Sequence, residues 1–157
     1  AGLIGFAALL GVLRFSGVTD VLGPHRFASL LSACCAFTLI AAGLRWPDAP
    51  LARRAAAAGR FVVIVGGVGV ALTVAGVGLW SQLVPGLSAL LIVITAVQQR
   101  SAPAMAGALL LVGSFVVAAL GKQDSLYLGL FNSTQALHYL LAAGLALLTW
   151  NRPSSPR

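Results

Sequence analysis

Glutamate is absent from this chain, and aspartate occurs only as Asp20, Asp48 and Asp124. Proton-driven exporters commonly couple through a carboxylate inside a membrane span, and membrane metalloproteases commonly use a glutamate as acid or base. None of the three aspartates falls within an apolar run. We therefore expect neither a coupled pump nor a metalloprotease of the HExxH kind.

Charge of either sign is scarce. Only 8% of the 157 residues are charged and 59% are apolar, with a mean hydropathy of +0.98. A soluble domain carries about 25% charged residues. The chain has too little polar surface to face water on all sides, so we expect the lipid bilayer to surround it.

The spacing motifs of redox and metal sites are also missing. Cys34 and Cys35 are adjacent within an apolar run, and no CxxC, HxxxH or HExxH pattern occurs. This argues against the usual membrane thiol oxidoreductases and leaves any metal or other cofactor unassigned. We interpret the two thiols as small buried side chains that pack within a helix.

Six apolar runs are present, whereas crossing about 30 Å of hydrocarbon takes about 20 residues. We predict an all-α polytopic membrane helix bundle of about six spans, as one domain over residues 1–151 with a polar tail at 152–157. The fourth run is short, and Pro85 and Gly86 near its start indicate a turn, so a re-entrant or half-depth fourth helix is the alternative. The runs lie near Ala1–Phe15, Phe27–Leu44, Phe61–Trp80, Leu83–Val97, Ala102–Leu120 and Thr134–Trp150.

The positive charges predict the orientation. Seven of the ten Lys and Arg fall on the amino-terminal side of a six-span chain and three on the other, which places both termini in the cytoplasm of an inner-membrane protein. The charges sit singly or in pairs between apolar runs, which argues against nucleic-acid binding. Trp46, Trp80 and Trp150 fall at predicted span ends, where indole rings prefer the interface. The first run lacks a basic leader, so we expect a span and not a cleaved signal peptide.

The third run is rich in glycine, and small residues recur at four-residue spacing through Gly67, Ala71 and Ala75. Such a stripe lets another backbone approach closely. It is either a homo-oligomer interface or an ordinary packing surface within the bundle, and we favour ordinary packing. A looser version occurs in the sixth run at Ala142 and Ala146.

An ionisable residue inside a span is a candidate functional residue. His138 lies inside the sixth run, with Gln135 on nearly the same helical face and Asn132 broadly aligned. One interpretation is a neutral histidine that is hydrogen-bonded across the bundle. The other is a ligand site.

The six-span topology gathers these side chains with others in the external half of the bilayer. We hypothesise an outward-opening cavity between the first, second and sixth spans, in which Arg14 and Arg26 hold an anionic headgroup or carboxylate and His138 forms part of the floor. A variant such as Arg14→Ala that kept full ligand binding would count against it. The gathered residues are Arg14, Asp20, His25, Arg26, Lys122, Asp124, Asn132, Gln135 and His138.

The stretch FNSTQALHYLLAAGLALLTW at 131–150 resembles the last helix of small bacterial multi-span proteins of uncharacterised function. These are distantly similar to the alkaline-ceramidase-like superfamily of membrane hydrolases, in which a late helix carries paired histidines and earlier helices supply Ser, His and Asp around zinc. Of the residues that surround zinc in that superfamily, only one has a counterpart in this chain, His138. Tyr139 and Leu141 stand where a second histidine is sought, and Arg14 stands where an earlier one is wanted. The resemblance covers about one helix and implies that the metal site is lost.

Three function classes remain open. The first is a non-enzymatic membrane protein that binds or conducts a small or lipid-like ligand from the external leaflet. The second is an intramembrane zinc-dependent hydrolase of lipid amides or esters, with His25, His138 and an aspartate around zinc. The third is a structural subunit of a membrane complex. The incomplete ligand set favours the first, and stoichiometric zinc that is lost on His138→Ala would favour the second.

Overall fold

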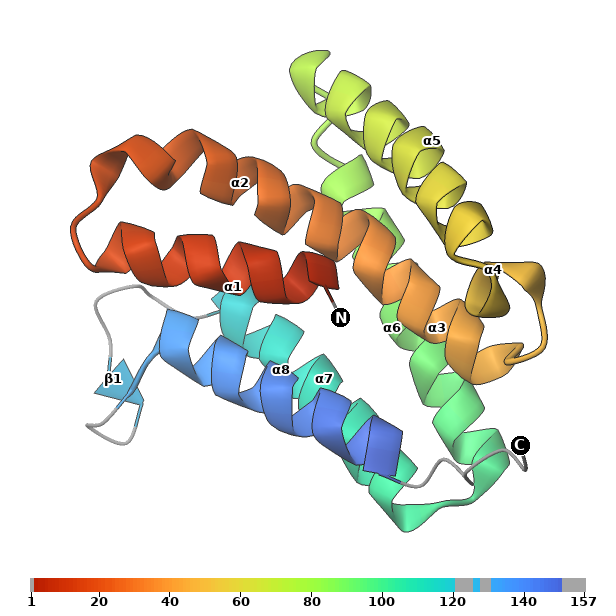
Figure 1. Ribbon diagram of the computed structural model, residues 1–157. Helices are drawn as coiled ribbons and strands as arrows, with labels where there is room; N and C mark the ends of the chain where they lie inside the picture. Colours follow the sequence, from red (N-terminus) through yellow and green to blue (C-terminus); the bar gives the residue numbers. More distant parts are fainter. Residues whose placement is uncertain (1, 121–125, 128–130, 151–157) are drawn as a thin grey trace. The chain divides into compact units, whose positions relative to one another are not determined.

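The computed structural model describes residues 2–120, 126–127 and 131–150, and nearly all of them are helical (Figure 1). The all-α part of the prediction is confirmed. The exception is a two-residue antiparallel ladder in which β1 (Leu126–Tyr127) pairs with β2 (Phe131–Asn132). The helices are α1 Gly2–Phe15, the 3₁₀ turn η1 Thr19–Val21, α2 Leu22–Leu31, the π turn η2 Ser32–Ala36, α3 Phe37–Arg45, α4 Pro50–Arg53, α5 Ala55–Val74, α6 Trp80–Gln99, α7 Ala102–Leu120 and α8 Ser133–Trp150.

Three helical segments are long and apolar enough to cross a membrane, by length and composition. They are Thr19–Arg45, Ala55–Val74 and Trp80–Gln99. Gly2–Arg14 and Ala102–Val117 are apolar but shorter over the described residues. Each predicted run therefore coincides with a helix, and the chain is compatible with an integral membrane protein.

The predicted turn at Pro85 and Gly86 is wrong. Both residues lie inside α6, which runs for 20 residues from Trp80. Pro85 is the sixth residue of this helix, where its ring removes one backbone hydrogen bond; membrane helices tolerate such a proline because nearby hydroxyls and neighbouring helices satisfy the freed backbone groups. The fourth helix is therefore of full length, and the predicted third run ends earlier, at Val74.

Glycines end two of the helices. Gly76 has a φ of 79°, its N–H donates to Thr73 O at 3.1 Å, and Val77 N–H donates to Leu72 O at 2.8 Å. This is a Schellman motif, which requires a left-handed residue and so favours glycine. Gly17 ends α1 in the same way, with a φ of 98°.

The chain divides into two compact units, residues 1–91 and 92–157, with the boundary inside α6. In the first unit α1 and α2 form an antiparallel hairpin (Figure 1). Ala7, Leu10 and Ala28 form its buried core, and Val21 packs against them. The small side chains of Ala7 and Ala28 let the two helices approach closely. The prediction of a single domain stays a prediction.

The long segment from α2 to α3 contains the π turn η2, in which Phe37 N–H donates to Ser32 O, five residues back. Neighbouring helices contact this turn from more than one side. Ser32 Oγ donates to Leu3 O of α1 at 2.9 Å, and Cys35 Sγ lies 3.9 Å from Val62 O of α5. Cys34 and Cys35 are 1% and 0% exposed. The prediction of two buried thiols is confirmed.

Helix α5 packs through a different face from the predicted one. Gly66 and Gly69 are buried, and a Cβ at Gly66 would lie 2.6 Å from Leu31 Cδ2. The predicted stripe through Gly67, with Ala71 and Ala75, is exposed instead. Packing within the first unit therefore uses Gly66 and Gly69, while a homo-oligomer through the exposed stripe stays a prediction.

In the second unit α7 and α8 lie side by side (Figure 1). Their backbones meet at two glycines: a Cβ at Gly107 would lie 2.8 Å from Gly144 O, and one at Gly144 would lie 2.9 Å from Gly107 O. Ala142 and Ala146 are exposed. The close helix approach expected of small residues therefore occurs at Gly144, between the two predicted alanines.

Large apolar side chains are exposed along α5. Val63, Ile64 and Val74 are 74%, 64% and 84% exposed. Soluble monomers rarely present contiguous apolar patches of this kind. An exposed apolar helix face of this kind is compatible with lipid as its surroundings.

Candidate functional site

His25 lies between the two helices of the α1–α2 hairpin. Its Nδ1 is 3.3 Å from Ala7 O, and a Cβ at Gly11 would lie 3.2 Å from the imidazole Cε1. A carbonyl oxygen only accepts, so a bond here requires the proton on Nδ1 and makes Nε2 the acceptor nitrogen of the neutral ring. Because Gly11 has no side chain, the half-buried imidazole ring of His25 packs directly against the backbone of α1.

Arg14 shares this face of α1. Leu10 and Gly11 are buried against α2, and a residue three to four positions later lies on the same side of the helix. Arg14 is half-buried, which agrees with that placement. It is also the basic residue of the last turn of α1, where a positive charge interacts favourably with the helix dipole. We call the face along which α1 and α2 contact each other the seam. Arg14 and His25 therefore both lie on the seam, about one helical turn apart.

Arg26 and Asp20 lie outside this seam. Arg26 follows His25 directly on α2, so it points about 100° away around the helix, and its side chain is exposed. Asp20 is exposed in η1. Of the predicted residues in the first unit, Arg14 and His25 are half-buried, while Asp20 and Arg26 are exposed at the rim of the hairpin.

The predicted residues of the last helix belong to the second unit. His138 is exposed, and its Nδ1 lies 2.6 Å from Thr134 O of its own helix. Gln135 is also exposed, so the two share the outer face of α8. Asn132 lies in β2, before α8 begins at Ser133, and its side chain is outside the described residues. The convergence of these residues with Arg14 and His25 stays a prediction, and Lys122 and Asp124 lie outside the described residues.

A metal centre has no support within the part of the chain that the structure describes. There, no three His, Cys, Asp or Glu side chains come together as ligands. A structural zinc site takes four ligands and a catalytic site takes three plus water. His25 and His138 lie on helices of different units.

Hydroxyl groups bridge helices at positions that the sequence does not distinguish. Thr38 Oγ1 of α3 lies 2.9 Å from Ser88 Oγ of α6, and each hydroxyl also lies within hydrogen-bond distance of a carbonyl oxygen one turn earlier, at Cys34 and Val84. Each hydroxyl has one proton, so two of these three bonds form at a time. Hydroxyls in membrane helices are expected to do both. The sequence shows eight or more such residues and gives no signal for which of them cross between helices.

No protein-family model, curated protein or solved structure matches this chain. Its function is therefore inferred from its own residues.

Proposed function

We propose that this protein is a six-span integral membrane protein with both termini in the cytoplasm, and that it binds a small anionic or lipid-like ligand at the α1–α2 hairpin in the external half of the bilayer. The observation that carries the proposal is the half-buried Arg14 on the same seam as His25. A guanidinium that is partly withdrawn from water binds an oxyanion more strongly than a fully solvated one does.

The length of the helices supports six spans. At 1.5 Å per residue, the 19 residues of α7 and the 18 of α8 extend about 28 and 27 Å, close to the roughly 30 Å hydrocarbon core. The 14 residues of α1 extend about 21 Å. A shorter helix is accommodated by local thinning and by a terminal arginine that reaches the interface, which is where Arg14 lies.

The chemistry of the seam favours an anion. Arginine offers five N–H donors in a planar fork that fits carboxylate and phosphate oxygens. The hairpin between residues 14 and 26 carries two arginines and one aspartate, so its charge is positive. The exposed apolar side chains of α1 and α2, such as Phe6, Leu9 and Phe27, offer an apolar surface to an acyl chain.

Binding of two probes tests the proposal and separates the two sources of negative charge. A spin-labelled fatty acid supplies a carboxylate, and phosphatidylglycerol supplies a phosphate diester. We expect the full chain in zwitterionic nanodiscs to bind at least one of them, and Arg14→Gln to weaken that binding about ten- to a hundred-fold, because a partly desolvated charge pair loses one partner.

The exposed Arg26→Gln serves as the matched rim variant and is expected to change affinity less than about three-fold. Arg100→Asn, in the other unit, is expected to change nothing. Wild-type protein that binds neither probe, or Arg14→Gln protein that binds as tightly as wild type, would contradict the proposal. Stoichiometric zinc that is lost on His138→Ala would indicate the hydrolase instead.

A further inference from the structure

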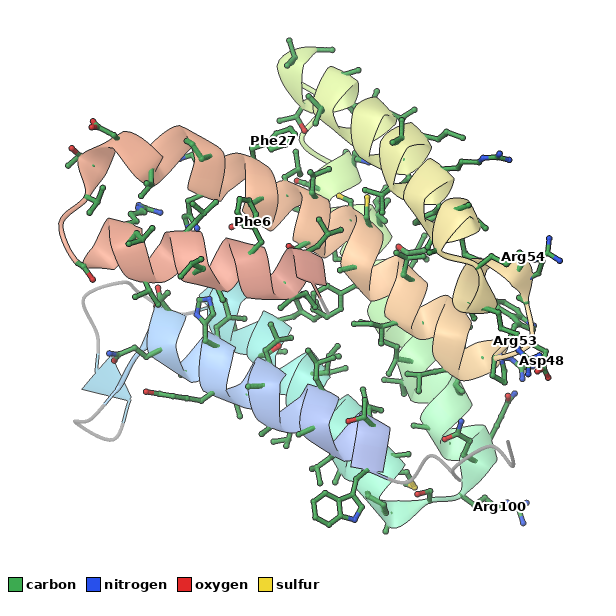
Figure 2. The ribbon with its side chains drawn as sticks, viewed as in Figure 1. Phe6, Phe27, Asp48, Arg53, Arg54 and Arg100 are labelled. Carbon is green, nitrogen blue, oxygen red and sulfur yellow. The ribbon has the colours of Figure 1, made fainter. Side chains whose placement is uncertain are left out.

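The connector between α3 and α5 gathers positive charge. Its four arginines, the basic connector, are Arg45, Arg53, Arg54 and Arg60, and all four are exposed. Figure 2 shows Arg53 and Arg54 at the α4 turn, with Asp48 beside Arg53. Asp48 is the one acid of the connector, so its formal charge is +3. The first turn of α5 adds no acidic residue.

Asp48 is paired with one of these arginines. Its Oδ1 lies 2.5 Å from Arg53 Nη2, and the two side chains are 80% and 66% exposed. An exposed pair of this kind contributes little to stability because water and salt screen it. It does occupy donors of Arg53 that another oxyanion could use, so Asp48 acts as an internal competitor for any anion that binds there.

The backbone of the connector is ordered by its own hydrogen bonds. Trp46 N–H donates to Ala42 O at 2.7 Å, and Arg54 N–H donates to Pro50 O at 2.8 Å. Pro50 opens α4 at a position where its missing N–H is harmless. The arginines are thus presented from a fixed turn, which lowers the entropy that a bound anion must overcome.

Trp46 indicates where the basic connector lies relative to the lipid bilayer. Its ring is 53% exposed, and Arg45 Cζ lies 5.8 Å from the ring centroid, within the range of a cation–π contact. The connector joins Thr19–Arg45 to Ala55–Val74, both long and apolar enough to cross a membrane. A tryptophan and arginines at the end of two such helices lie at the level of lipid headgroups.

We propose that the basic connector binds the phosphate groups of anionic glycerophospholipids. Arg53 and Arg54 contact the phosphate, Trp46 lies against the headgroup region, and Asp48 weakens binding by holding Arg53. This lipid site is on the opposite side of the membrane from the hairpin ligand site. A lipid surface fits better than a soluble acidic partner because the positive turn connects two apolar helices directly.

Quenching of Trp46 by brominated lipid tests the proposal on the full chain. Trp80→Phe and Trp150→Phe leave Trp46 as the only emitter. Trp80 Nε1 has no hydrogen-bond partner among the described residues, so phenylalanine loses no hydrogen bond there. The protein is reconstituted into phosphatidylcholine vesicles that contain either brominated phosphatidylglycerol or brominated phosphatidylcholine at equal mole fraction.

We expect brominated phosphatidylglycerol to be enriched about five-fold or more at Trp46, since each arginine near an anionic surface contributes an enrichment of about five-fold. Arg53→Gln and Arg54→Gln are each expected to lower the enrichment about two- to five-fold. Asp48→Asn is expected to raise it by a similar factor. Salt at 0.5 M is expected to lower it, because screening shortens the range of the charges.

Arg100→Asn is the matched control, because it removes one exposed arginine elsewhere and asparagine accepts the φ of 49° found at that position. Neither this variant nor Arg14→Gln is expected to alter quenching of Trp46, which separates this site from the hairpin site. Equal quenching by the two lipids, an enrichment that survives the double variant Arg53→Gln/Arg54→Gln, or a lower enrichment in Asp48→Asn would overturn the proposal.

Discussion

Replacing Gly144 with valine is expected to force α7 and α8 apart and to lower the free energy of unfolding by about 2–3 kcal/mol. A Cβ at this position would lie 2.9 Å from Gly107 O and 3.2 Å from Leu111 N. Both are backbone atoms, so a rotamer change cannot relieve the contact and a helix must move. Circular dichroism during titration with a denaturing detergent measures the change in stability.

Gly113→Val is the matched control on α7, because no described atom lies within 4 Å of a Cβ there. It is expected to change stability by less than about 1 kcal/mol. Gly107→Ala should behave like the Gly144 variant, since its Cβ would lie 2.8 Å from Gly144 O. Equal losses in Gly113→Val and Gly144→Val would show that the two glycines do not form the helix contact.

Ile64→Arg is expected to lower strongly the fraction of chains in which α5 crosses the membrane. Ile64 lies at the middle of α5 and is 64% exposed. On a soluble protein an arginine at an exposed helix position changes stability within about 0.5 kcal/mol. At the centre of a spanning helix it disfavours insertion by about 2.5–3.5 kcal/mol. Labelling of Leu79→Cys, in the exposed turn that follows α5, by a membrane-impermeant maleimide on intact cells measures the integrated fraction of α5.

Val77→Arg provides the comparison. Val77 is also exposed, at 44%, but it lies in the turn between α5 and α6, where an arginine remains in the interface. Its integrated fraction is expected to equal that of the wild type. If Ile64→Arg and Val77→Arg integrated equally well, α5 would not be surrounded by lipid.

Apolar runs locate the helices, because a segment that crosses lipid needs apolar side chains and must satisfy its backbone by hydrogen bonds within a helix. The turns are harder to predict. Pro85 and Gly86 carry the composition of a turn, yet both lie in α6, while the helix before them ends at Val74 and is followed by the left-handed Gly76. Several glycines between residues 66 and 86 offered a left-handed residue, and the sequence does not say which one closes the Schellman motif.

The sequence predicts that helices approach closely at small residues, but it does not predict which small residues make the contact. Small residues occur on α5 at two registers, and the structure buries Gly66 and Gly69 while it exposes Gly67. The choice depends on side chains from other helices, Leu31 among them. The π turn at Cys34 and Cys35 has no sequence signal, because the extra residue depends on contacts from α1 and α5.

The seam of Arg14 and His25 follows in part from the sequence. A short link between two apolar helices predicts an antiparallel hairpin, which brings the end of α1 beside the start of α2. The half-buried state of Arg14 and the bond from His25 to Ala7 O depend on helix rotation, which a run of apolar residues does not specify. The outer face of α8 carries His138 and Gln135 as the helical period predicts.

The sidedness of single cysteines tests the six-span arrangement most directly. The native Cys34 and Cys35 are 1% and 0% exposed, so they provide an unreactive background for a membrane-impermeant maleimide on intact cells. We expect labelling from outside at Ser16→Cys and Lys122→Cys. Labelling only after permeabilisation is expected at Gly2→Cys, Ala49→Cys and Ser101→Cys. If Gly2→Cys reacted from the same side as Ser16→Cys, or Ser101→Cys from the same side as Lys122→Cys, α1 or α7 would not cross and six spans would be wrong.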